Sequence, residues 1–256
     1  MDELRWNLHP DGLLVVGLFA GLYGIGVRGE VVPRWRLACF GGGLALVLAA
    51  HVTPLASLAT TSLLSAHLLQ NVVFAEWAPA LVVLGIPAGL GAGFGGLPGA
   101  RILTHPVVAL PVWLGTYVAW HVPAVYDAAL RQPSTLLHLE HASYFVAGVL
   151  LWWPVFQAVP HRIPSGAKAV YLFAAFVLAS PIGIVLALLS RPVYGFYVDA
   201  PDVWGLSDLT DQQIAGVTMS VEEAVGFFLL CAYFVVRFVR EEEARELFRE
   251  HSSQIA

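Results

Sequence analysis

Apolar residues fill seven long stretches of the chain, and polar residues, glycine and proline collect between them. The stretches span 11–28, 36–56, 62–87, 107–123, 138–160, 167–189 and 211–238. A helix needs about 20 residues, at 1.5 Å each, to cross a hydrocarbon core about 30 Å thick. The pattern therefore predicts an all-α, polytopic membrane helix bundle with seven transmembrane helices over residues 1–240, followed by a charged helix or tail at 241–256.

Positive charge is distributed unevenly between the two ends of such a bundle. With seven spans, Arg5, Arg131 and Arg191 lie on the same side as the N-terminus, and the other ten of the 13 lysines and arginines lie on the opposite side. Short cytoplasmic loops carry the excess of lysine and arginine in membrane proteins. We therefore expect the N-terminus outside and the C-terminus in the cytoplasm.

The composition supports a membrane protein and excludes several other classes. Hydrophobic residues make up 58% of the chain and charged residues only 12%, with a mean hydropathy of +0.73, whereas soluble domains carry about 25% charged residues. The net charge of −5 gives no basic surface for nucleic acid. A retinal pump needs a lysine within its last span, but the one lysine, Lys168, opens the sixth stretch.

A glycine-rich segment at 85–99 is predicted to be a cytoplasmic loop. Gly91–Gly96 matches the G-x-G-x-x-G pattern of dinucleotide-binding proteins. That pattern requires a preceding strand within a βαβ unit, and here it follows a predicted helix. We therefore do not interpret it as a nucleotide site.

Histidines are the candidate functional side chains. Five of them fall at a similar depth near the outer ends of four predicted spans: His51, His67, His121, His138 and His141. Ionisable groups within a membrane are costly and usually face a bundle interior or cavity. Each could instead be a packing residue that hydrogen-bonds to a carbonyl, but their common depth predicts a shared metal or proton-handling site.

Other polar side chains lie close to this histidine layer or deeper, and we expect them to orient ligands or relay protons. Met219 adds a thioether, which with imidazole suits Cu(I), while zinc is the alternative metal. Glu140 could orient a ligand or pair with Arg131, and Glu76 could be a packing residue or a proton relay. The remaining members of the set are Gln70, Asn71, Asp211, Gln212, Glu222 and Glu223.

Several ordered motifs resemble one membrane family. They are Ala66-His67-Leu-Leu-Gln70, Ala78–Pro87, Trp120–Asp127, Leu137–His141, Trp152-Trp-Pro154, Pro164–Lys168 and Asp211–Met219. Together they resemble the CtaG-type cytochrome c oxidase assembly factors, the membrane family of the caa-type oxidase. Through its motif, Asp127 joins the residues that would orient ligands. The family commonly has histidine where this chain has Asn71, and it tends toward Trp and Pro-Gly where this chain continues as Ser220-Val-Glu222-Glu223.

The resemblance implies a non-enzymatic assembly factor for a haem–copper oxidase in the bacterial plasma membrane. Its partners would be the lipid bilayer, oxidase subunits and a copper chaperone, with no nucleic acid, and copper would be handled at the outer face. Two alternatives stay open. One is a b-type haem electron-transfer protein, although the histidines cluster in one layer. The other is a proton- or cation-coupled transporter that uses Glu76, Glu222 and Glu223.

Overall fold

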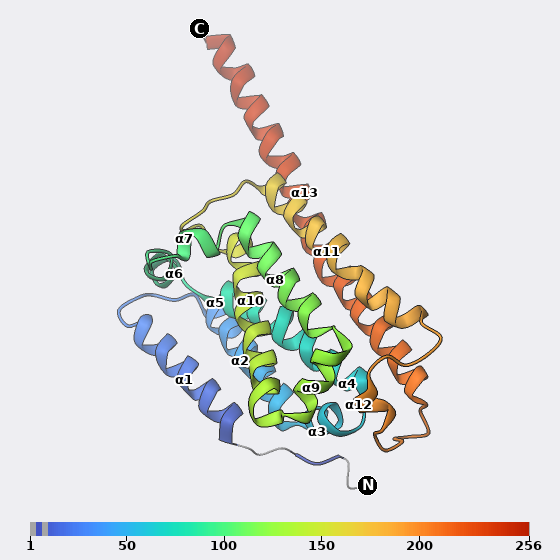
Figure 1. Cartoon of the computed structure of the whole chain (residues 1–256). Helices are drawn as coiled ribbons and strands as arrows, with labels where there is room; N and C mark the ends of the chain where they lie inside the picture. Colours follow the sequence, from blue (N-terminus) through green and yellow to red (C-terminus); the bar gives the residue numbers. More distant parts are fainter. Residues whose placement is uncertain (1–3, 7–9, 256) are drawn as a thin grey trace.

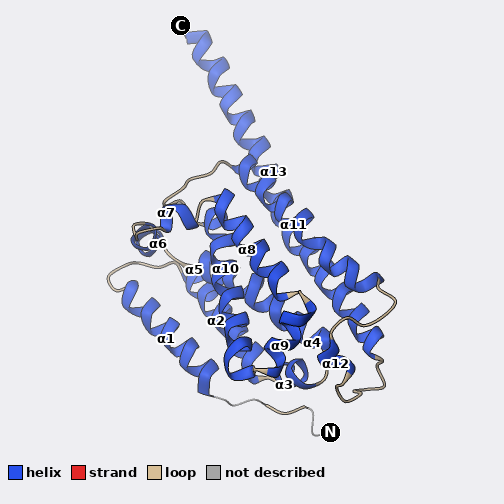
Figure 2. Cartoon of the chain, viewed as in Figure 1, coloured by secondary structure: helices blue, strands red, loops and turns tan. Residues whose placement is uncertain are grey.

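Long helices lie side by side between the two ends of a single bundle (Figure 1). The computed structural model describes residues 4–6 and 10–255, and within these residues all regular structure is helical (Figure 2). The long helices are α1 (Pro10–Gly26), α2 (Arg34–Val52), α4 (Leu64–Val72) continued by η1 (Val73–Trp77) and α5 (Ala78–Gly85), α8 (Pro106–Trp120), α10 (His138–Phe156), α11 (Ser165–Leu188) and α13 (Asp208–Ile255).

Short helices close the bundle at both ends. Figure 1 places α3 (Pro54–Thr61), α9 (Pro123–Arg131) and α12 (Gly195–Val198) at one end, which we call the outer end after the predicted orientation. At the opposite, inner end lie α6 (Ala88–Gly95) and α7 (Ala100–Leu103). The π-helical turn η2 (Pro133–Leu137) joins α9 to α10.

The predicted fold class, an all-α membrane protein, is confirmed. In the described part of the chain, four helices are long and apolar enough to cross a membrane, or five if the bent pair α8–α9 counts as one span. Of the other predicted spans, α1 is short, and α10 begins with His138, Glu140 and His141. Seven spans, the orientation of the termini and the division at residue 240 stay predictions; residues 1–3, 7–9 and 256 lie outside the described residues.

Proline sets two helix boundaries that hydropathy misplaced. The predicted stretch 36–56 runs past Thr53, which is extended (ψ 168°), and Pro54 starts a separate helix. Proline disfavours the helical conformation of the residue before it. In the same way, Pro123 opens α9, and the chain bends by 74° between α8 and α9.

Two other expectations need correction or extension. Residues 88–95 form helix α6, so the predicted loop at 85–99 was wrong over these residues. Gly91 lets this helix lie close to the Gln157 side chain, because a Cβ added at Gly91 would lie 2.6 Å from the Gln157 Oε1. The predicted charged tail is helical, but it continues α13 without a break over 48 residues.

Glycines allow the central helices to approach each other closely. A Cβ on Gly216 of α13 would lie 2.5 Å from the Gly183 carbonyl oxygen of α11, and one on Gly148 of α10 would lie 2.2 Å from the Ala75 carbonyl oxygen of η1. Small residues permit this backbone approach where lipid gives helices no hydrophobic reason to associate. The contact at Gly148 holds α10, with its histidines, against the helix that carries His67.

Candidate functional site

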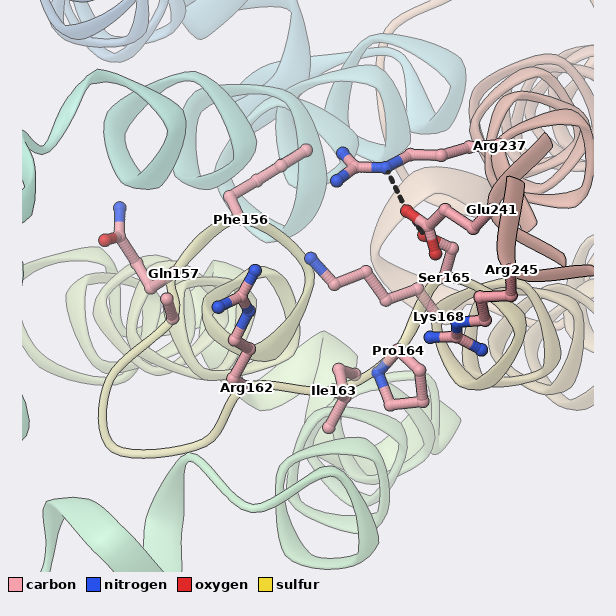
Figure 3. A pocket seen from close by; sticks show the side chains of 11 residues that line it. Phe156, Gln157, Arg162, Ile163, Pro164, Ser165, Lys168, Arg237, Glu241 and Arg245 are labelled. Carbon is pink, nitrogen blue, oxygen red and sulfur yellow. Dashed lines mark hydrogen bonds and ion pairs between the residues drawn. The ribbon is translucent and has the colours of Figure 1, made fainter. Parts of the chain in front are cut away.

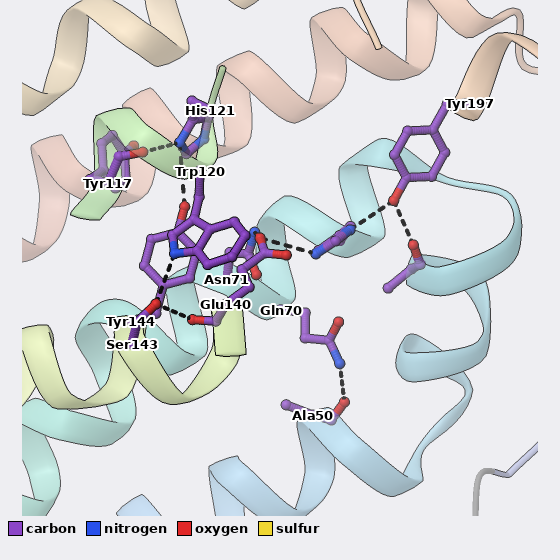
Figure 4. Close-up of polar contacts among 12 residues, drawn as sticks. Ala50, Gln70, Asn71, Tyr117, Trp120, His121, Glu140, Ser143, Tyr144 and Tyr197 are labelled. Carbon is purple, nitrogen blue, oxygen red and sulfur yellow. Dashed lines mark hydrogen bonds and ion pairs between the residues drawn. The ribbon is translucent and has the colours of Figure 1, made fainter. Parts of the chain in front are cut away.

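His67 is fully buried and held by a tyrosine from a distant part of the chain. Its Nδ1 lies 2.9 Å from the hydroxyl of Tyr197 in α12, and that hydroxyl lies 2.5 Å from the Ala59 carbonyl oxygen of α3 (Figure 4). A carbonyl only accepts, so the Tyr197 hydroxyl donates its single proton to Ala59 and accepts from the His67 Nδ1–H. The neutral His67 ring therefore presents the lone pair of Nε2.

Two further histidines have the same tautomer for the same reason. The Nδ1 of His121 lies 2.8 Å from the Tyr117 carbonyl oxygen, and that of His51 lies 2.8 Å from the Val47 carbonyl oxygen. Since a carbonyl cannot donate, each Nδ1 carries the proton and each neutral ring presents Nε2 as a lone pair. Metal-binding histidines are typically fixed in this way, with the second nitrogen bonded to a carbonyl or another acceptor.

His141 is the central ring of the layer. Its centroid lies 5.9 Å from that of His51 and 6.1 Å from that of His67. Two imidazoles on one tetrahedral ion have centroids roughly 5 Å apart, given metal–nitrogen distances of about 2.0–2.1 Å. Each of these two pairs is thus about 1 Å wider than two imidazoles on one shared ion. His121 is linked to them through Tyr126, whose ring lies 5.0 Å from His67 and 6.3 Å from His121.

A buried carboxyl group faces His67. Glu140 is fully buried, and its Oε1 accepts a 2.9 Å hydrogen bond from the Asn71 side chain and lies 3.5 Å from the His67 Nε2 (Figure 4). With the His67 proton on Nδ1, a carboxylate oxygen and a nitrogen lone pair face each other. A proton or a metal cation between them removes this repulsion. The structure thus places Glu140 beside His67, a candidate metal ligand. Orienting a ligand was one of the two roles predicted for Glu140; pairing with Arg131 was the other.

Buried atoms without hydrogen-bond partners cluster at the same place. Within the described part of the chain, the Nε2 atoms of His67, His121 and His141 and the Oε2 atom of Glu140 are buried and make no hydrogen bond. Such groups are rare because leaving them unpaired costs about 1–3 kcal/mol each. The donor set fits a cation that binds nitrogen and oxygen.

The five predicted histidines are not all equivalent. His138 is exposed, and with His51 and His141 it lines two adjoining cavities of about 330 and 320 Å³. Met219 is 1% exposed and lies in the main hydrophobic cluster. Among residues 4–6 and 10–255, no group of three or more histidine, cysteine, aspartate or glutamate side chains is already arranged to hold a metal ion.

Four polar residues from the predicted set hold the surrounding elements in place. Asp211 of α13 accepts from the Leu64 and Ser65 backbone N–H groups at 2.6 and 3.3 Å and so caps α4 three residues before His67. Gln212 bonds the Val193 N–H and the Leu186 and Arg191 carbonyls, and Asp127 accepts from the Phe196 N–H at 3.2 Å. Gln70 donates to the Ala50 carbonyl of α2 at 2.7 Å. These contacts position the helices that carry the histidines and Tyr197.

A separate acidic cluster lies deeper in the bundle. Glu76 and Glu223 are 3% and 1% exposed, and Glu222 lies beside Glu76. The Tyr117 hydroxyl donates to Glu223 and the Trp77 indole N–H donates to Glu222, both at 2.6 Å. Glu76 lies on the π-helical turn η1, and such turns are frequent at functional sites. Because the Tyr117 ring also lies 4.6 Å from that of His121, this residue connects the acidic cluster to the histidine layer.

A family model matches most of the chain. The model of the cytochrome c oxidase caa3 assembly factors (Caa3_CtaG) matches residues 17–241 of 256. The chain belongs to this family. The matched range contains all five histidines, Met219 and the acidic cluster, so the resemblance inferred from the motifs is confirmed. No curated protein and no solved structure matches the chain.

Membership defines the broad role of this Caa3_CtaG protein, an assembly factor of cytochrome c oxidase that works in a membrane with oxidase subunits. Sequence reasoning missed the tyrosines that organise its site: Tyr117, Tyr126, Tyr144 and Tyr197 are all buried. One sequence feature could have indicated α12. Tyr194 and Tyr197 are three residues apart between two predicted spans, a spacing that places both on one face of a helical turn.

Proposed function

We propose that this Caa3_CtaG protein is a non-enzymatic assembly factor that binds copper in the histidine layer at the outer face of the bacterial plasma membrane and passes it to an oxidase subunit. A copper chaperone would deliver the metal. The observation that carries the proposal is that His67 and His121 each bond an acceptor through Nδ1 and hold a buried Nε2 that makes no hydrogen bond.

Copper fits this donor set better than a hard cation does. Neutral imidazole suits copper and zinc, whereas magnesium and calcium prefer oxygen ligands. The centroid distances above imply that the His141 ring and either of the His51 and His67 rings would need to approach each other by about 1 Å to bind one ion together. A site that closes only when the metal binds also releases it more readily, which suits a protein that hands metal on.

Access supports the same proposal. His51 and His141 line both cavities at the outer end, and the exposed His138 lies beside them. A metal ion could first meet His138 and then reach the buried rings. Met219, buried in the adjoining hydrophobic cluster, would supply a soft sulfur ligand if the helices close around Cu(I).

The test is oxidase assembly in cells that depend on this chain. We expect His67→Ala/His141→Ala to lower oxidase activity and copper content in the membrane while the chain accumulates normally. The matched control is His105→Ala/His161→Ala. These two rings also lie close together, with centroids 4.9 Å apart, but they lie at the inner end of the bundle. Equal oxidase activity in the two double variants would contradict a role for the histidine layer.

A second candidate function rests on the acidic cluster. Glu76, Glu222 and Glu223 present buried oxygens without hydrogen-bond partners among the described residues, and buried carboxyl groups in membranes commonly take up and pass on protons. This favours coupling to proton or cation movement as the alternative role. Flux into proteoliposomes that falls to background in Glu76→Gln would support it, and the absence of flux in the unmodified protein would exclude it.

A further inference from the structure

A basic cavity lies at the inner end of the bundle, opposite the end that holds the histidine layer. It has a volume of about 530 Å³ and lies between the loop after α10, the start of α11 and the charged half of α13. Four cationic side chains line it: Arg162, Lys168, Arg237 and Arg245. Figure 3 shows Arg162 and Lys168 pointing toward one another across the cavity, with Arg237 above them.

Only part of this positive charge is neutralised by the protein. Glu241 accepts from the Arg237 Nε at 2.8 Å and from the Ser165 hydroxyl at 2.9 Å, and these donors hold its pKa below the ordinary value, so it is ionised at neutral pH. Arg245 pairs with Glu242. Within residues 4–6 and 10–255, neither Arg162 nor Lys168 forms an ion pair with an acidic side chain; Lys168 donates to the Val155 carbonyl oxygen.

The start of α11 adds hydrogen-bond donors to the same cavity. Pro164 precedes this 24-residue helix and offers no side chain to cap it, while Pro164 and Ser165 both line the cavity. The first backbone N–H groups of a helix have no partner within the helix and favour an anion. A ligand with several anionic oxygens would reduce the repulsion among the cationic side chains and accept hydrogen bonds from these N–H groups.

An apolar groove continues from the cavity along α13. Leu229, Tyr233 and Val236 line it, and it shares Arg237 with the cavity. These three side chains are exposed, as expected of residues that face lipid. Basic pockets between helices at the cytoplasmic side of membranes bind anionic lipid headgroups, and here the adjoining groove is suited to an acyl chain.

We propose that this cavity binds a phosphate group and that an anionic phospholipid carries it, with the headgroup between Arg162, Lys168 and Arg237 and an acyl chain along α13. A lipid in this place would join α11 to α13 at the point where α13 leaves the bundle. The proposal is independent of copper handling, because the cavity and the histidine layer lie at opposite ends of the molecule and share no residue.

The experiment measures lipid binding to the purified full-length chain in detergent. The probes are phosphatidylglycerol, phosphatidylcholine with the same acyl chains, and inorganic phosphate. The test variant is Arg162→Gln/Lys168→Gln. The matched control, Arg28→Gln/Arg249→Gln, removes the same charge from exposed positions that line neither the cavity nor the groove.

We expect the chain to bind phosphatidylglycerol in preference to phosphatidylcholine. The test variant should lose roughly 30-fold in affinity, from two cationic contacts, and the control less than threefold. Arg162→Gln alone should lose roughly fivefold, which keeps the test informative if the double variant folds poorly. Equal loss in the test and control variants would overturn the site, and inorganic phosphate binding as tightly as phosphatidylglycerol would overturn the assignment to a lipid.

Discussion

Replacing Tyr197 by phenylalanine tests how the tautomer of His67 is set. The substitution removes one oxygen and leaves the ring in place. It breaks the 2.9 Å contact with the His67 Nδ1 and the 2.5 Å hydrogen bond to the Ala59 carbonyl. The imidazole then loses the acceptor that keeps its proton on Nδ1, so the Nε2 lone pair is no longer fixed toward the candidate metal position.

The magnitude follows from the two contacts that are lost. Each buried hydrogen bond contributes about 0.5–1.5 kcal/mol, so the free energy of unfolding should fall by about 1–3 kcal/mol. Removing the group that holds a metal-binding histidine typically weakens metal affinity 10–100-fold. We therefore expect a Cu(I) affinity lower by about that factor, measured by competition with a coloured Cu(I) chelator, together with a modestly lower Tm in detergent.

Tyr171→Phe is the matched control for this substitution. Its hydroxyl also donates to a buried carbonyl, that of Leu151, at 3.0 Å, and the residue is 6% exposed compared with 4% for Tyr197. Because it loses one hydrogen bond, it should lower the Tm by about half as much, and it should leave Cu(I) affinity unchanged. If both variants bind Cu(I) equally well, the hydroxyl of Tyr197 does not prepare His67 for a metal and the reasoning is refuted.

Three further predictions concern the residues around the site. Glu140→Gln keeps an acceptor for Asn71 but removes the negative charge beside His67, so Cu(I) affinity should fall about 10–100-fold; an unchanged chelator titration would contradict a cation between the two residues. Gly148→Val should lower stability by about 1–3 kcal/mol because its Cβ meets the Ala75 carbonyl, and Gly115→Val, where an added Cβ meets nothing within 4 Å, should have little effect on thermal unfolding. Asp211→Ala removes the acceptor for the first N–H groups of α4 and should cost about 1–2 kcal/mol, whereas an equal loss of Tm in Asp208→Ala would argue against specific capping.

Hydropathy located the long helices because their length and composition are local properties. It misplaced the helix ends at Thr53 and around His121, where Pro54 and Pro123 act on the backbone of the preceding residue. It also gave no indication that η1 forms at Val73–Trp77. That turn faces Gly148, and the close backbone contact between them depends on two segments far apart in the chain.

The histidine layer could be predicted from the sequence alone, because the rise per residue of a helix and the direction of each span place His51, His67 and His141 at one depth. The contact that fixes the tautomer of His67 could not be predicted. Tyr197 reaches His67 from α12 across 130 residues of sequence, and Asp211 reaches the start of α4 across 147. Asp211, Gln212 and Asp127 were predicted to orient ligands or relay protons; in the structure, their hydrogen bonds hold backbone segments in place.

Copper binding by the purified chain tests the proposed metal site most directly. The chain should be loaded with Cu(I) under reducing conditions, freed of excess metal and assayed for copper per polypeptide. We expect equal copper in the unmodified chain and in the inner-end control His105→Ala/His161→Ala, and a loss to background in His67→Ala/His141→Ala. Copper retained in full by His67→Ala/His141→Ala would contradict a metal site in the histidine layer.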